Sequence, residues 1–274
     1  MIRQLLPAPV RRSARKTYNS ILDQVDRLRG RHDPLVPPRN LNYIGDGDYK
    51  GVAEHFFAHL VEIGGLRPDD RILDIGSGLG RMAIPLTRYL SPGGSYQGIE
   101  IVPRGVEWSQ REITARHPNF RFTHADIYNK MYNPGGQYKA SEYRFPFADR
   151  AFNFVFATSV FTHMYPADVA RYLSEIARVL QPGGSSFTTF FILTPESRRL
   201  VASGQSSQRF VYQGDGYMTT NDEVPENAIA FDECEVRRMH SGSGLTILDP
   251  IYHGWWSGRQ GSKSYQDIVL ARKP

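Results

Sequence analysis

The stretch that most constrains the fold runs from Arg71 to Arg81 and reads RILDIGSGLGR. Its first five residues are mostly apolar and lie between turn formers, which predicts a short buried strand of a parallel sheet. Three of the next five residues are glycines, at positions 76, 78 and 80, and a helix is predicted over 82–90. A strand, a glycine turn and a helix place backbone N–H groups and the positive end of a helix against a ligand.

The spacing of the glycines distinguishes this turn from two other nucleotide-binding turns. In a dinucleotide-binding turn the third glycine would stand at the position of Arg81, and in a P-loop a lysine would follow in register. Here the third glycine is Gly80, and an acid, Asp74, precedes the first glycine by two residues. This pattern resembles the first motif of the class I S-adenosylmethionine-dependent methyltransferases. A turn with a purely structural role would rarely need three glycines in five residues.

The resemblance covers residues from about 45 to 193 and the last pair of predicted strands. It implies an α/β fold of the Rossmann-like kind, with a seven-stranded, mostly parallel sheet flanked by helices, and S-adenosyl-L-methionine as the cofactor. The segments SVFTHM (159–164), PGG (182–184) and SYQDIVLA (264–271) are similar, less specifically, to bacterial enzymes of glycan or secondary-metabolite pathways.

The resemblance also implies which residues hold the cofactor. Glu100 ends the second predicted strand, where an ionised carboxylate can accept hydrogen bonds from both ribose hydroxyls; the alternative is a surface glutamate at a strand end. Asp126 and Ile127 match the family positions that meet the adenine amino group and cover the ring. Tyr49 belongs to a glycine- and tyrosine-rich loop that either covers the cofactor or only connects two elements. The full predicted cofactor set is Asp74, Gly76, Ser77, Gly78, Gly80, Glu100, Ile101, Asp126, Ile127, Ser159 and Tyr49.

His163 is the predicted general base. It lies just beyond the strand predicted over 152–158, at the edge where folds of this kind bind ligands. A hydroxyl acceptor must lose its proton, and a group with a pKa near 7 suits that step. The alternative is a histidine at a helix start that only hydrogen-bonds the backbone. Because Thr158 and Ser159 stand where metal-dependent O-methyltransferases carry an acid, we expect no catalytic metal.

The sequence divides into a basic leader with a linker, 1–40, and a methyltransferase domain, 41–274. Within that domain, residues 194–230 interrupt the succession of strands and helices, which predicts an insertion with a hairpin that caps the substrate. A helix is predicted over 231–240, and the last two strands are predicted over 245–252 and 264–272.

The leader carries the basic character of the chain. Residues 1–31 have a net charge of +6, so the remainder has −1. A helix is predicted over 10–29, and one face of it is apolar at helical spacing: Ala14, Tyr18, Ile21, Val25 and Leu28. One interpretation is a basic helix that makes a peripheral contact with anionic lipid or with nucleic acid. The other, which we favour, is a helix that packs on the body through this stripe and leaves its arginines in water.

The predicted function is O-methylation of a small hydroxylated acceptor, such as a sugar unit or a secondary metabolite. Two alternatives are an RNA or DNA methyltransferase that uses the leader as a phosphate clamp, and a non-catalytic cofactor-binding protein. The nearly neutral body argues against a nucleic-acid substrate. The presence of Asp74, Glu100, Asp126 and His163 argues against the non-catalytic alternative.

The bulk composition predicts a cytoplasmic protein. There is one cysteine, Cys234, so no internal disulfide forms, which suits a reducing compartment. No apolar run is long enough for a membrane span, and the N-terminus lacks the apolar core of a secretory signal. The sequence does not indicate an oligomeric state.

Overall fold

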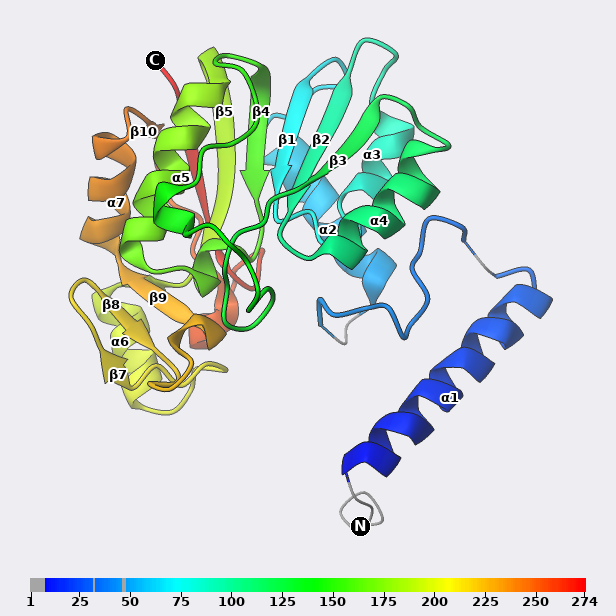
Figure 1. The fold of residues 1–274 in the computed structure, drawn as a ribbon. Helices are drawn as coiled ribbons and strands as arrows, with labels where there is room; N and C mark the ends of the chain where they lie inside the picture. The colour runs from blue at the N-terminus through cyan, green and yellow to red at the C-terminus, as the bar shows by residue number, and fades with distance from the viewer. Residues whose placement is uncertain (1–7, 32, 46–47) are drawn as a thin grey trace.

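The structure, a computed structural model, describes residues 8–31, 33–45 and 48–274. Its centre is a seven-stranded sheet with the strand order β10-β11-β5-β4-β1-β2-β3 (Figure 1). The strands are β1 (Arg71–Ile75), β2 (Ser95–Glu100), β3 (Phe120–His124), β4 (Phe152–Ala157), β5 (Leu180–Phe190), β10 (Thr246–Ile247) and β11 (Asp267–Arg272). The first five are parallel, whereas β11 runs antiparallel to both β5 and β10. The predicted fold class is therefore confirmed.

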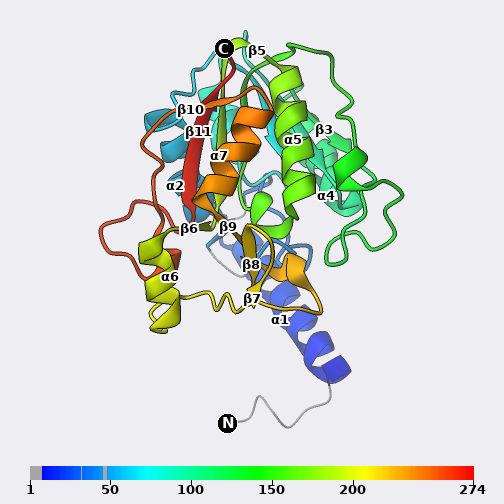
Figure 2. The same ribbon diagram turned by 90° about the vertical axis from the view of Figure 1, so that its left-hand side faces the viewer.

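Helices cover both faces of this sheet (Figures 1 and 2). One face carries α2 (Tyr49–Glu62), α3 (Ala83–Tyr89) and α4 (Pro103–Ser109), and the other carries α5 (Pro166–Val179) and α7 (Glu233–Gly242). Successive residues of a strand enter opposite cores: Ile72 packs with the first set of helices and Leu73 with the second. Strands buried on both faces need apolar residues at nearly every position, which explains the continuous apolar runs in the sequence.

Several boundaries differ from the sequence predictions. α4 is followed directly by a π-helical turn, Gln110–Thr114, which extends the helical segment between β2 and β3. The helix predicted to begin at residue 231 begins at Glu233, because residues 229–232 form strand β9 (Ile229–Asp232). The strand predicted over 245–252 is reduced to β10 and ends before Pro250, which has no N–H to donate.

The insertion after β5 forms a second, four-stranded sheet. Its strand order is β6-β9-β8-β7, and it is accompanied by α6 (Pro195–Ala202). Its other strands are β6 (Ile192–Leu193), β7 (Tyr212–Gln213) and β8 (Tyr217–Thr219). The antiparallel pair β7–β8 is the hairpin predicted within 194–230. The short 3-10 turn Pro225–Asn227 follows β8 and brings the insertion to the site described below.

The leader forms α1 (Ala8–Leu28), which extends away from the body (Figure 1). Residues 1–7 of the predicted leader lie outside the described residues. Tyr18, Ile21 and Leu28 of the apolar stripe are 61%, 52% and 88% exposed. The interpretation that we favoured, in which this stripe packs on the body, is therefore wrong. Across the described residues, no helix combines the length and the apolar character needed to cross a membrane.

Candidate active site

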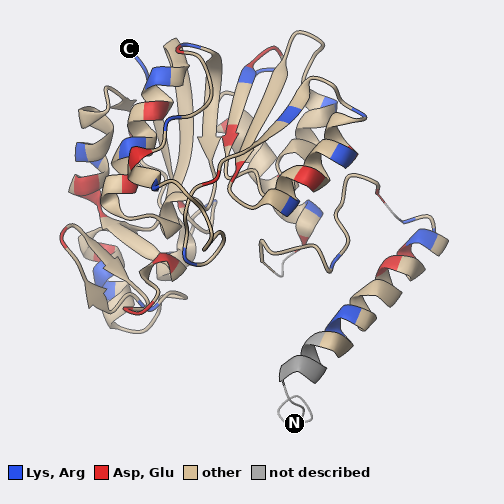
Figure 3. Ribbon diagram, viewed as in Figure 1, with Lys and Arg blue, Asp and Glu red and all other residues tan. Residues whose placement is uncertain are grey.

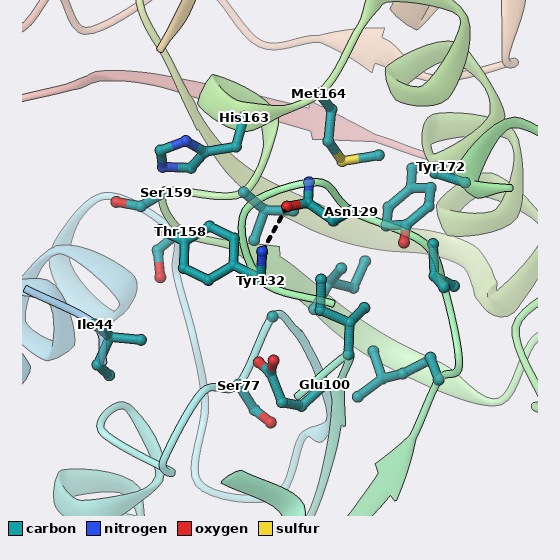
Figure 4. Close-up of a pocket in the computed structure, with 18 of the residues that line it drawn as sticks. Ile44, Ser77, Glu100, Asn129, Tyr132, Thr158, Ser159, His163, Met164 and Tyr172 are labelled. Carbon is teal, nitrogen blue, oxygen red and sulfur yellow. Dashed lines mark hydrogen bonds between the residues drawn. The ribbon is translucent and has the colours of Figure 1, made fainter. Parts of the chain in front are cut away.

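A cavity of about 550 Å³ lies at the C-terminal ends of β1, β2 and β4 (Figure 4). Its size is within the range of pockets that enclose a small organic ligand. Its walls come from the loop 43–45, α2, the turn after β1, the end of β2, the segments after β3 and β4, the first turns of α5, and the insertion. Parallel strands end at one edge, and loops leaving that edge can converge on one ligand.

The glycine turn forms one wall of the cavity. Gly76 and Ser77 line it, whereas Gly78 and Gly80 shape the turn from behind. Gly76 has a φ of +76°, and a Cβ there would lie 2.4 Å from Cγ2 of Val160, another wall residue. Gly78 has a φ of +58°, a conformation that a β-branched residue strongly disfavours. Glycine is thus required in this turn because the backbone takes positive φ angles and because neighbouring side chains lie too close for a Cβ.

Glu100 presents a buried carboxylate to the cavity. The residue is 6% exposed, and its two oxygens accept hydrogen bonds from the N–H groups of Gly78, at 2.7 Å, and Val102, at 2.8 Å. Burial raises the pKa of Glu100, and these hydrogen bonds oppose that shift. Each carboxylate oxygen can accept a further hydrogen bond, so the group can still receive two hydroxyls. Glu100 therefore links the glycine turn to the end of β2 and remains available to a ligand.

Asp74 lies behind the turn instead of in the cavity wall. It is 1% exposed, and one carboxylate oxygen accepts a hydrogen bond from the hydroxyl of Tyr96. The other oxygen, Oδ1, is buried without a hydrogen-bond partner. Burial raises the pKa of Asp74 to about 8. The acid of the motif thus contacts β2 and supports the turn from below the cavity.

The raised pKa of Asp74 predicts a pH dependence of stability. Between its ordinary value of 3.8 and about 8, the folded protein holds a proton that the unfolded chain has released. The free energy of unfolding should therefore fall as pH rises, by at most about 1.4 kcal/mol per pH unit. Asp74→Asn, which cannot ionise, should flatten this slope between pH ~6.5 and ~8. Thermal melts of both proteins across that interval test it, and parallel pH profiles would contradict it.

His163 lies in the 3-10 turn Phe161–His163 that follows β4, and it lines the cavity (Figure 4). Its Nδ1 is 2.7 Å from the backbone carbonyl oxygen of Glu226. Because a carbonyl can only accept, Nδ1 carries the proton in the neutral ring and Nε2 keeps its lone pair. Burial lowers the pKa of His163, and the contact with Glu226 opposes that shift. The imidazole is therefore neutral near pH 7, with Nε2 able to accept a proton.

Ser159 occupies an unusual backbone conformation in the cavity wall, with a φ of +57°. Its N–H donates to Oγ1 of Thr189 at 2.8 Å, and its hydroxyl donates to Oε1 of Gln266 at 3.1 Å. These partners belong to β5 and to the segment before β11, so the central sheet holds the turn after β4 in place. Non-glycine residues in this region are uncommon and often lie at functional sites.

Two further predicted residues, Tyr49 and Asp126, lie outside the cavity wall, as Asp74, Gly78 and Gly80 do. The hydroxyl of Tyr49 donates to the carbonyl of Leu79 at 3.1 Å, and the loop before it reaches the cavity through Tyr43 and Ile44. Asp126 is partly buried, while Ile127 lines the cavity. The remaining predicted residue, Ile101, is also a wall residue. The part of the chain that the structure describes contains no cluster of three or more His, Cys, Asp or Glu side chains able to hold a metal ion.

Residues 72–184 match the family described as "Methyltransferase domain". This segment therefore resembles a methyltransferase domain. It contains β1 except Arg71, all of β2, β3 and β4, and the start of β5. It also contains the wall residues of the cavity, except those from the loop 43–45, from α2 and from the insertion.

Curated relatives of the methyltransferase domain include enzymes with two kinds of acceptor in their names. Phthiotriol/phenolphthiotriol dimycocerosates methyltransferase 1 of Mycobacterium ulcerans is 33% identical over 132 residues, which cover 47% of this chain and 39% of that protein. The 27-O-demethylrifamycin SV methyltransferase of Amycolatopsis mediterranei is 27% identical over 194 residues, 69% of this chain and 62% of that protein. The chain thus spans less than two thirds of the length of these relatives.

Solved structures share the architecture of the methyltransferase domain. The crystal structure of a SAM-dependent methyltransferase from Methanosarcina mazei aligns with a TM-score of 0.52 at 20% sequence identity. The alignment covers 78% of this chain and 96% of the archaeal chain. This likeness supports the fold.

Three residues of the cavity wall have roles that the sequence motifs did not predict. Glu226 comes from the insertion, holds His163 through its carbonyl group and buries Oε2 without a hydrogen-bond partner. Tyr43 has a buried, unpartnered hydroxyl and packs its ring against the guanidinium of Arg104 at 4.8 Å. Arg81 donates to the carbonyl of Ile44 and so fastens the loop 43–45 to the glycine turn. Arg81 ends the glycine motif, and Tyr43 lies in the glycine- and tyrosine-rich loop that the sequence places before it. No sequence signal located Glu226 at the site.

Proposed function

We propose that this protein transfers a methyl group from S-adenosylmethionine to a hydroxyl group of a small acceptor, such as a sugar unit or a secondary metabolite. The observation that carries this proposal is one cavity with two chemically different groups. Glu100 supplies a buried carboxylate beside the glycine turn, and His163 supplies a neutral imidazole with Nε2 free.

The cofactor side of the cavity fits the chemistry of a nucleoside. Glu100 would accept hydrogen bonds from the ribose hydroxyls, beside Gly76 and Ser77 of the turn. Ile101 and Ile127 supply apolar surface for the base. S-adenosylmethionine supplies a methyl group already activated on a sulfonium, so the protein has mainly to orient the acceptor and exclude water.

The acceptor side of the cavity is suited to removing a proton from a hydroxyl group. His163 Nε2 would accept the proton, and the carbonyl of Glu226 would hold the proton already on Nδ1 and stabilise the resulting imidazolium. Tyr132 packs its ring edge-on against the imidazole, with centroids 5.8 Å apart, and restricts its orientation. The loop 43–45 and the insertion wall off the two flanks and limit access of water. The name of the rifamycin relative, a 27-O-demethyl substrate, supports transfer to oxygen.

Calorimetric titration with S-adenosylmethionine tests the cofactor assignment. Glu100→Gln preserves the shape of the side chain and removes its charge, so affinity should fall about tenfold to a hundredfold, the equivalent of a charged hydrogen bond of roughly 1.5–3 kcal/mol. Glu107→Gln, on the exposed surface of α4, is the matched control and should bind like the wild type. An unchanged affinity in Glu100→Gln would assign the ribose to another residue.

Methyl transfer itself is tested with labelled S-adenosylmethionine and fractions of hydroxylated metabolites. Label that appears in an alkali-stable methyl ether supports transfer to oxygen. Label found only on nitrogen or carbon would contradict O-methylation while leaving methyltransferase activity in place.

A further inference from the structure

α1 presents an apolar face that the body does not cover. Tyr18, Ile21 and Leu28 lie on one side of the helix and are more than half exposed. Ala14 on the same side is exposed as well, while Val25 is partly buried. Such a face on a helix that projects from a folded domain is costly in water unless something covers it.

The polar side of α1 is already occupied by the linker that follows it. Arg39 pairs with Asp23 at 2.6 Å and with Asp26 at 2.7 Å. The side-chain amide of Asn40 donates to the carbonyl of Lys16 and to the hydroxyl of Ser20, both at 2.9 Å. These contacts orient the helix, so that its linker-bound side is fixed and its apolar side faces outward. They also neutralise both acidic side chains of the helix.

What remains on α1 and its C-terminal end is basic. Lys16, Arg27, Arg29 and Arg31 are exposed. Along the described part of the helix in Figure 3, acidic residues lie between basic ones. Because a helix is about 10 Å across, comparable to the Debye length at physiological salt, charges on any side of it still attract an anionic surface. An apolar stripe on a helix whose polar side carries basic residues is the pattern of a helix that lies in a lipid interface.

The position of α1 relative to the cavity is consistent with a surface-bound protein. Figure 1 places α1 on the side of the molecule toward which β4 and β5 point, and the cavity lies at that same edge of the sheet. Figure 2, turned by 90° about the vertical axis, keeps α1 on that side.

We infer that α1 binds the interface of an anionic lipid bilayer, with Tyr18, Ile21 and Leu28 inserted among the acyl chains and the basic residues against the headgroups. A second copy of the chain would satisfy the apolar stripe but would bring like charges together. Nucleic acid would satisfy the basic residues but would leave the stripe in water. The bilayer is the one partner that satisfies both features. This inference does not depend on the proposed reaction.

Co-sedimentation of the full-length protein with lipid vesicles tests it. The protein should sediment with vesicles of phosphatidylcholine and phosphatidylglycerol, and far less with phosphatidylcholine alone. Ile21→Asp should lower the bound fraction roughly tenfold or more, because it places a charge in the apolar layer. Asn19→Asp adds the same charge two residues away on the polar side of the helix, and should retain most of the binding. Melting curves should match in all three proteins, because position 21 lies outside the folded core.

Three outcomes would overturn the inference. One is the absence of binding to anionic vesicles. Another is binding that both Asp variants weaken equally, which would indicate attraction of charges without insertion. The third is a dimer in light scattering that Ile21→Asp converts to monomer in the absence of vesicle binding, which would assign the stripe to a second copy of the chain.

Discussion

Replacing His163 with alanine is expected to lower turnover by about 10²–10⁴-fold, the usual contribution of a positioned base, and to leave affinity for S-adenosylmethionine nearly unchanged. The reason is geometric. The Nδ1 proton of His163 is held by the carbonyl of Glu226, so Nε2 is the atom available to a hydroxyl acceptor. Steady-state rates measured beside calorimetric titrations separate the two effects.

The pH profile gives a second readout for His163. Burial lowers its pKa from the ordinary value of 6.5, so the ring is already neutral at pH 7. The wild-type rate should therefore rise with pH through one ionisation on the acidic side of 6.5, and this limb should vanish in His163→Ala. His55→Ala, on the exposed surface of α2, is the matched control and should keep both rate and profile. A His163→Ala protein that retained the acidic limb at reduced rate would assign the proton to a different group.

Replacing Gly78 with valine is expected to lower affinity for S-adenosylmethionine about 10²–10³-fold. A β-branched residue at a φ of +58° is strained by roughly 1–2 kcal/mol, and the turn can relieve this strain only by changing its backbone conformation. Relief of that strain moves the N–H of Gly78 away from Glu100, a charged hydrogen bond of about 1.5–3 kcal/mol. The new Cβ would also lie 3.2 Å from Cδ1 of Ile44 and so press on the loop that covers the cavity.

Gly65→Val separates backbone strain from damage to the site. Gly65 also has a positive φ, +71°, but a Cβ there meets nothing within 4 Å, and the residue lies outside the cavity wall. It should lose stability and keep its affinity for the cofactor. Equal losses of affinity in the two variants would mean that Gly78 acts through the stability of the fold alone. Full affinity in a folded Gly78→Val protein would remove the turn from the site.

The sequence by itself determined the central sheet and the cavity wall that the glycine turn and the end of β2 form. These features depend on neighbours in the chain: a strand of apolar residues, three glycines that must take or allow special backbone conformations, and an acid at the next strand end. Gly76, Ser77 and Glu100 all reached the cavity wall as the motif predicts. Asp74 shows the limit of that reasoning, because the spacing locates the residue in the motif but does not show whether its side chain faces the ligand or Tyr96.

Tertiary structure alone decided how the site is completed and what α1 contacts. Glu226 is 63 residues from His163 in the chain, and only the packing of the second sheet brings its carbonyl to that ring. Residues 231–232 were predicted to begin a helix but end β9, because this strand pairs with both β6 and β8. An apolar stripe in a sequence predicts that some surface will cover it, without saying which one. For α1, the ion pairs of Arg39 with Asp23 and Asp26 hold the opposite side of the helix and leave the stripe outward. Long-range contacts of this kind leave no pattern in the local sequence, because they stabilise the protein only when segments far apart in the chain come together.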